Sequence, residues 1–250
     1  MNRKMCMKVI SISLLILCGS LLWYFLSATK QDTVQAKAKV VGTDGGLLVY
    51  GEDENFSGLT SVGMGEALLP ETLSVGDTIQ FSFDGMVAES YPCKINNVEE
   101  LTVITEGNDI MKVYREAFLN LRAEDSDLDY GAERITLDIS GVTNLSEGEK
   151  EALHYLISCD VGRFGESGFG VEEATFEELV AEGSISVDEN GFHEFEDGIH
   201  YEISATAQED GFLFDIHKMR SSQGVYGFYD CKATFTENGV VWEEGSSFSS

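Results

Sequence analysis

Residues 9–28 form an uncharged apolar run, VISISLLILCGSLLWYFLSA, which constrains this 250-residue chain more than any other feature. A helix of that length rises about 30 Å, the thickness of the hydrocarbon core of a bilayer. Arg3, Lys4 and Lys8 precede the run, and no acidic residue occurs among the first thirty. Because basic flanks stay in the cytoplasm, the pattern predicts a single-pass transmembrane anchor behind a short cytoplasmic tail, residues 1–8.

A cleaved signal peptide is the alternative to this anchor. Signal peptides have a shorter apolar core and small residues at positions −3 and −1 of the cut. Cleavage after Ala28 would place the bulky Leu26 at −3, and Leu17 stands where a lipoprotein signal needs a small residue before its cysteine. We therefore favour an uncleaved anchor over residues 9–28, followed by a polar stalk (29–33) and an extracytoplasmic body.

The charge of the chain limits its partners. There are 44 Asp and Glu against 16 Lys and Arg, a formal net charge of −28, and the acids all lie beyond the first thirty residues. A body this acidic repels phosphate backbones, so nucleic acid is not an expected partner. Dispersed acids are typical of a soluble surface, and attraction of cations or cationic peptides is the functional alternative.

Residues 34–106 show the alternation of short strands and no helical pattern. Val75-Gly76-Asp77 predicts a tight turn, and Ile79, Phe81 and Phe83 behind it alternate with polar residues, as in a half-buried strand. Four or five such strands in about 70 residues predict a small antiparallel β-barrel. The other expected segments are a hairpin around Asp44-Gly45-Gly46, an acidic loop at 52–65 and a closing strand at 97–105.

The pattern changes near Gly107, where we place a domain boundary. Apolar residues recur at helical spacing from 109 to 123, and a strand around Leu137 follows. Ser146 and Glu149, and then Thr175 and Glu178, have the spacing of capping boxes, which open helices. These helices are expected to end near Cys159 and at Gly183.

Turn dipeptides dominate the rest of the chain. Asn-Gly or Asp-Gly pairs predict hairpins at residues 190, 197, 210 and 238. Residues 108–245 are therefore predicted to form an α+β domain with helices packed on an antiparallel meander sheet, and residues 246–250 a disordered tail.

Two regions resemble uncharacterised proteins. The first is VGDTIQFSFDGMVAESYPCKI, which is similar to the signature of a small extracytoplasmic β-barrel domain of unknown function from Gram-positive bacteria. The second comprises ITLDISGVTNLSEGEKEAL, TFEELVAEGSI and KMRSSQGVYGFYDCKA, which resemble another domain of such membrane-anchored or lipoprotein-like proteins. The resemblance covers most of residues 35–243 and implies a fold and a location. It implies no activity.

Ser204, His217 and Asp215 are the most suggestive set for catalysis. A two-residue turn at Asp210-Gly211 would place Ser204 opposite His217, with Asp215 on the same face. A serine hydrolase needs its nucleophile, base and orienting acid in hydrogen-bond contact. Side chains two apart on a strand lie about 6–7 Å apart, so we favour a solvated outer sheet face over a catalytic triad.

Asp125, Asp127 and Asp129 resemble the start of a calcium loop. The glycine comes one residue late, at Gly131, and Thr136 stands where a bidentate Glu belongs. We therefore favour a solvated acidic turn. The four histidines show no ligand spacing. The sequence thus predicts neither a metal site nor a cofactor.

Three of the five cysteines, Cys93, Cys159 and Cys231, fall in the predicted extracytoplasmic body. An odd number is not a disulfide framework. Pairing of Cys159 with Cys231 is one possibility. We favour three free cysteines that pack as small apolar side chains.

The leading functional hypothesis is a non-catalytic, membrane-tethered module that binds or senses an envelope ligand or protein. The alternatives are an extracytoplasmic serine hydrolase that uses Ser204, and a purely structural envelope protein. Catalysis requires a concave site with perturbed titratable groups, which separates the hydrolase from the other two hypotheses.

Overall fold

A computed structural model of the protein describes residues 33–53, 56–64, 69–70, 72–164 and 170–250. The predicted tail, the anchor and the stalk up to residue 32 lie outside the described residues. Within those ranges no helix combines the length and apolarity needed to cross a membrane. The described chain is α+β, as predicted, and sheets dominate it.

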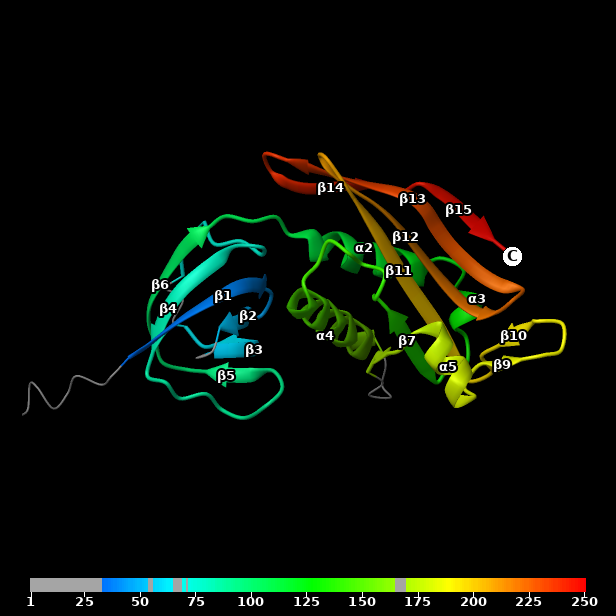
Figure 1. Ribbon diagram of the computed structural model, residues 1–250, viewed down its shortest axis with the longest axis horizontal. Coiled ribbons are helices and arrows are strands. Elements are labelled where there is room, and N and C mark those ends of the chain that lie inside the picture. The colour runs from blue at the N-terminus through cyan, green and yellow to red at the C-terminus, as the bar shows by residue number, and fades with distance from the viewer. Residues whose placement is uncertain (1–32, 54–55, 65–68, 71, 165–169) are drawn as a thin grey trace, which may run out of the picture.

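The first sheet has six strands in the order β5-β3-β2-β1-β4-β6 (Figure 1). One face buries Phe56, Phe81 and Phe83, whose rings meet edge to face or tilted. The β-barrel prediction is wrong, because the two end strands, β5 and β6, do not pair with each other and the sheet stays open. The loop predicted at 52–65 instead contains β3. The strands are β1 (Val34–Gly42), β2 (Leu47–Asp53), β3 (Phe56–Val62), β4 (Thr78–Phe83), β5 (Cys93–Ile95) and β6 (Val98–Thr105).

The Val75-Gly76-Asp77 turn holds the link between the two halves of the chain. Asp77 is buried, and its carboxylate accepts hydrogen bonds from the backbone N–H groups of Ser74 (2.9 Å) and Gly107 (3.0 Å). Gly76 has φ +97°, and a Cβ there would lie 2.5 Å from the carbonyl oxygen of Asn108. Only glycine fits this turn without strain, because other residues rarely adopt that φ and the linker leaves no space.

The second sheet has nine strands, and its path is β14-β13-β12-β11-β7-β8. Antiparallel hairpins form at residues 190, 210 and 238 as predicted. The hairpin predicted at 197 is wrong, because β10 pairs with β9 and β12 and not with β11. Strand β7 pairs in parallel with both β11 and β8, so the sheet is mixed. The disordered tail predicted at 246–250 is wrong for Ser246–Ser249, which pair with β13. The strands are β7 (Arg134–Asp138), β8 (Glu172–Glu173), β9 (Ser186–Val187), β10 (His193–Glu194), β11 (Gly198–Gln208), β12 (Gly211–Ser221), β13 (Gly224–Thr236), β14 (Gly239–Glu243) and β15 (Ser246–Ser249).

Both capping boxes form. The Glu149 carboxylate accepts from the Ser146 backbone N–H at 3.0 Å, and the Ser146 hydroxyl accepts from the Glu149 N–H at 3.3 Å. Thr175 and Glu178 repeat the arrangement, and that helix ends at Gly183 as predicted. The helices described are α2 (Ile110–Ala123), α3 (Ser126–Asp129), α4 (Glu147–Phe164) and α5 (Phe176–Glu182), so α4 runs five residues beyond Cys159.

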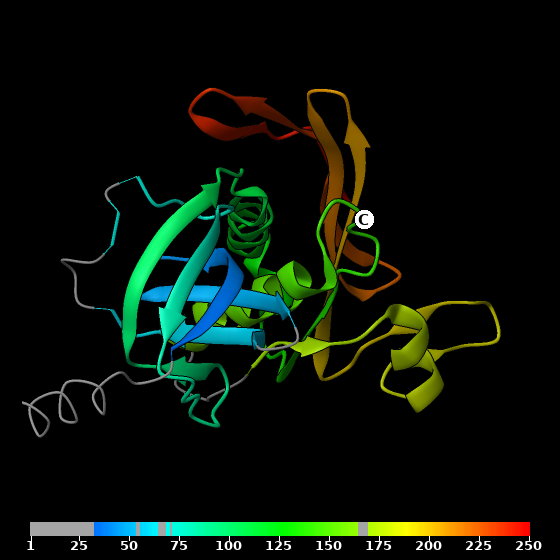
Figure 2. The same ribbon diagram turned by 60° about the vertical axis from the view of Figure 1, so that its left-hand side comes forward.

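Helices α2 and α4 form a layer between the two sheets (Figures 1 and 2). Helix α2 packs on β12, β13 and β14, while α4 packs on β2, β3 and α2. One apolar cluster therefore runs from Leu48 and Leu59 of the first sheet, through the helices, to Phe214 of the second. Each sheet lies on its own side of Gly107, but this shared core joins them, and separate folding of 34–106 and 108–245 stays a prediction.

Candidate functional site

In the β11–β12 hairpin the turn begins one residue earlier than predicted, so each residue of β11 faces a partner two residues earlier in β12. The loop consists of Glu209 and Asp210, because Gln208 pairs with Gly211. Ser204 therefore lies opposite Asp215, and His217 lies opposite Glu202, with 3.5 Å between its Nε2 and a carboxylate oxygen. The structure brings Ser204 beside Asp215 but leaves His217 diagonal to Ser204, where Cβ atoms are about 7 Å apart.

Other groups engage the remaining members of that set. An Asp215 carboxylate oxygen accepts a hydrogen bond from the Asp230 backbone N–H at 2.7 Å. The His217 ring stacks on Tyr229 with 6.3 Å between centroids. These side chains lie on a half-exposed surface of the sheet and make structural contacts there. None of those contacts places His217 as a base beside the Ser204 hydroxyl.

Two of the three aspartates of the calcium-like sequence, Asp125 and Asp129, contact a lysine. Lys218 of β12 is fully buried, and its ammonium donates to the carbonyls of Glu124 (2.7 Å) and Asp125 (3.2 Å) and to the Asp129 carboxylate. Asp127 is exposed. In the described part of the chain, no group of three or more His, Cys, Asp or Glu side chains is arranged to hold a metal ion.

The three described cysteines are free thiols, so the possible pairing of Cys159 with Cys231 is not formed. Cys231 lies on β13 and is buried in the apolar core, and this burial raises the pKa of its thiol. Cys159 lies on α4 and is half-buried. It lines the cavity described next.

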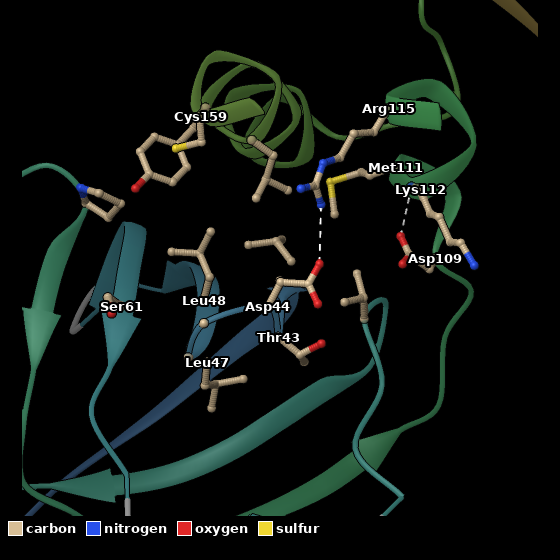
Figure 3. A pocket seen from close by; sticks show the side chains of 18 of the residues that line it. Thr43, Asp44, Leu47, Leu48, Ser61, Asp109, Met111, Lys112, Arg115 and Cys159 are labelled. Carbon is tan, nitrogen blue, oxygen red and sulfur yellow. Dashed lines mark hydrogen bonds and ion pairs between the residues drawn. The ribbon is translucent and has the colours of Figure 1, made fainter. Parts of the chain in front are cut away.

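A cavity of about 570 Å³ lies between the first sheet and the helix layer (Figure 3). The β1–β2 turn and the residues around it form one wall, and α2 and α4 form the other. This volume lies within the usual range for small-molecule sites, about 300–1,000 Å³. The apolar lining residues are Val41, Leu47, Leu48, Val75, Met111, Leu119 and Leu156.

Arg115 is held in place at the cavity by a buried acid. Its Nε and Nη2 both donate to the Asp160 carboxylate, and Asp160 is buried. This pairing raises the pKa of Arg115. The remaining nitrogen, Nη1, points across the cavity to Asp44 at 3.7 Å (Figure 3), which is longer than a hydrogen bond.

The other charges that α2 brings to the cavity have local roles. The Asp109 side chain caps α2 by accepting from the Lys112 backbone N–H at 3.0 Å, and burial raises the pKa of its carboxyl group. The Lys112 ammonium extends away from the cavity centre (Figure 3) and lies 3.8 Å from Glu116. Arg115 is thus the cation of α2 that faces the cavity.

Sequence reasoning missed this site because its parts are far apart in the chain. Arg115 and Asp160 are 45 residues apart, and each stands on a helix with many other charged residues. The available signal was the Arg115 position itself, one turn after Met111 on the apolar face of a predicted helix. Nothing in that pattern identifies the turn at Asp44 as the opposite wall.

The chain was compared with protein-family models, with curated proteins and with solved structures, and none of these matches it.

Proposed function

We propose that this protein is a non-catalytic binding protein, tethered to the membrane by residues 9–28, with its ligand cavity between the first sheet and helices α2 and α4. The observation that supports binding is the cavity of about 570 Å³, which combines apolar and polar side chains with an inward-facing arginine. Small-molecule sites are typically concave, mostly apolar and furnished with a few orienting polar groups.

Binding fits this cavity better than catalysis. The acids and bases that α2 brings to it already hold structural contacts, as the Asp109 cap and the Arg115–Asp160 pair show. A general acid or base must instead reach the reacting group. The hydrolase alternative draws no support from the hairpin register, which separates Ser204 from His217.

The proposed membrane anchoring rests on the apolar run of residues 9–28 and the basic residues before it. We expect external protease to digest the body in wall-stripped cells, while residues 1–8 and the anchor stay protected with the membrane. An N-terminal tag followed by immunoblotting measures this. A mature form that starts at or after Thr29 in the culture medium would show that the anchor is cleaved.

Binding is tested by ligand-observed NMR on the full chain in detergent, with a mixed set of neutral, cationic and anionic fragments. Leu156→Trp and Leu119→Trp each enlarge a half-buried leucine that lines the cavity. Fragments that bind the wild type should lose about tenfold or more in affinity in both variants, because the indole occupies their space.

Leu213→Trp is the matched control. Leu213 is a half-buried leucine of β12 that does not line the cavity. This variant should bind the fragments as the wild type does, and thermal melting checks that all three variants are folded. Fragments that bind all variants equally, or no binding at all, would refute the proposed function.

A further inference from the structure

We propose that the cavity takes a small monocarboxylate with an apolar body, and that its carboxylate occupies the place of Asp44 at Nη1 of Arg115. This inference rests on the proposed function, since it names the ligand of the same cavity. Three features support it: the unused edge of Arg115, the displaceable Asp44 and the charge balance of the lining.

The guanidinium of Arg115 is fixed on one side and available on the other. Its Nε and Nη2 are held by Asp160, so the group cannot rotate freely. Nη1 faces the cavity and lies 3.7 Å from the nearest Asp44 oxygen, beyond hydrogen-bond length. A positioned N–H donor of a cation forms strong hydrogen bonds with carboxylates, and orienting it costs little because Asp160 already does so.

Asp44 can leave its position without disturbing the fold. Its side chain is 81% exposed. It stands in the β1–β2 turn beside Gly45 and Gly46, where a Cβ on either glycine would meet nothing within 4 Å. The Asp44 carboxylate therefore shows where a ligand anion could lie beside Arg115. It binds there only weakly, because solvent screens its attraction to Arg115.

The charges and walls of the cavity select the rest of the ligand. Its charged lining residues, with Asp160 behind Arg115, comprise four acids and three bases, so a second negative charge on a ligand would be repelled. Leu48, Met111 and Leu156 offer an apolar surface that suits a hydrocarbon or aromatic body. These features favour a monoanion over a phosphate or dicarboxylate. The acidic lining residues are Asp44, Asp109 and Glu116, and the basic ones are Lys94, Lys112 and Arg115.

The test uses 4-phenylbutanoate and 4-phenylbutanamide, which share a shape and differ in charge, titrated calorimetrically into the full chain in detergent. The wild type should bind the carboxylate about tenfold more tightly than the amide. Asp44→Asn should strengthen carboxylate binding about threefold and leave amide binding unchanged, because it removes the competing charge. Asp210→Asn, which neutralises an exposed turn acid elsewhere, controls for net charge and should change neither affinity.

Arg115→Gln alone leaves Asp160 buried without its cation, so the variant used is Arg115→Gln with Asp160→Asn. This pair removes both charges, and it should bind the two compounds equally. Equal binding of both compounds to the wild type, or a carboxylate preference that survives the double variant, would overturn the inference. The proposed function would still stand if Leu156→Trp blocked fragment binding, so the two failures are distinguishable.

Discussion

Replacing Lys218 with methionine should lower the free energy of unfolding by about 3–5 kcal/mol, the usual cost of removing one partner of a buried ion pair. The Lys218 side chain is fully buried, and its ammonium joins the Asp129 carboxylate to the carbonyls of Glu124 and Asp125. Methionine fills the space but donates no hydrogen bond. The Asp129 carboxylate and both carbonyls would then lose the ammonium together. Asp129 would keep the hydrogen bond from the Tyr201 hydroxyl at 2.7 Å and the more distant Arg122 at 3.9 Å.

Urea unfolding of the full chain in detergent measures this loss. Lys232→Met is the matched control, since Lys232 lies exposed on the neighbouring strand β13 and its replacement should cost less than about 0.5 kcal/mol. Adding Asp129→Asn to Lys218→Met should recover part of the stability, because it removes the carboxylate charge that has lost the ammonium. A loss below about 1 kcal/mol for Lys218→Met would mean that water or a rearranged loop compensates for the missing ammonium.

The contacts of Lys218 also bear on the resemblance of the sequence around residues 125–129 to a calcium loop. Oxygens of this segment do surround a cation, but that cation is an ammonium from β12, 89 residues away from Asp129. Sequence spacing identifies oxygen ligands within one segment. It does not show that a distant lysine enters them, because tertiary packing alone sets that approach.

Features that depend only on nearby residues were predictable from the sequence. The two capping boxes, the helix of residues 109–123 and the alternation of Ile79, Phe81 and Phe83 each depend on neighbours within a few residues. Register was less predictable: the turn before Gly211 begins one residue earlier than expected, and that single step moves His217 from Ser204 to Glu202.

Long-range relations were not predictable from the chain. Whether six strands close into a barrel depends on pairing between the outermost strands, and here β5 and β6 do not pair with each other. The cavity lies between α2 and a turn from the other half of the chain, and its Arg115 is held by Asp160, 45 residues away. Neither relation leaves a periodic signal in the sequence.

Acidification should destabilise the fold through His200. This histidine of β11 is 1% exposed, and its Nδ1 lies 2.8 Å from the Thr136 hydroxyl. Burial lowers its pKa from 6.5 to about 4, and the nearby His217 adds to this effect, while Asp138 and Glu177 partly oppose it. Nε2 is also buried, and no hydrogen-bond partner reaches it among the described residues.

Because His200 binds its proton at a lower pH in the folded protein than in the unfolded chain, acid favours unfolding. Above pH 6.5 His200 is neutral in both, so it has no effect. Between pH 6.5 and about 4 the unfolded chain binds a proton that the folded protein rejects, and the free energy of unfolding falls as the pH falls. A depression of this size corresponds to about 3 kcal/mol, reached near pH 4 and constant below it.

His200→Gln isolates this contribution from the carboxyl groups that also titrate below pH 5. Glutamine keeps a polar contact for Thr136 but does not titrate, so the variant should lose about 3 kcal/mol less than the wild type between pH 7 and pH 4 in urea unfolding. His217→Gln, a quarter-exposed histidine two strands from Thr136, should still show nearly the full wild-type loss. Parallel pH profiles for His200→Gln and the wild type would show that the imidazole takes up its proton without cost, by a local opening under α5 that exposes Nε2 to water.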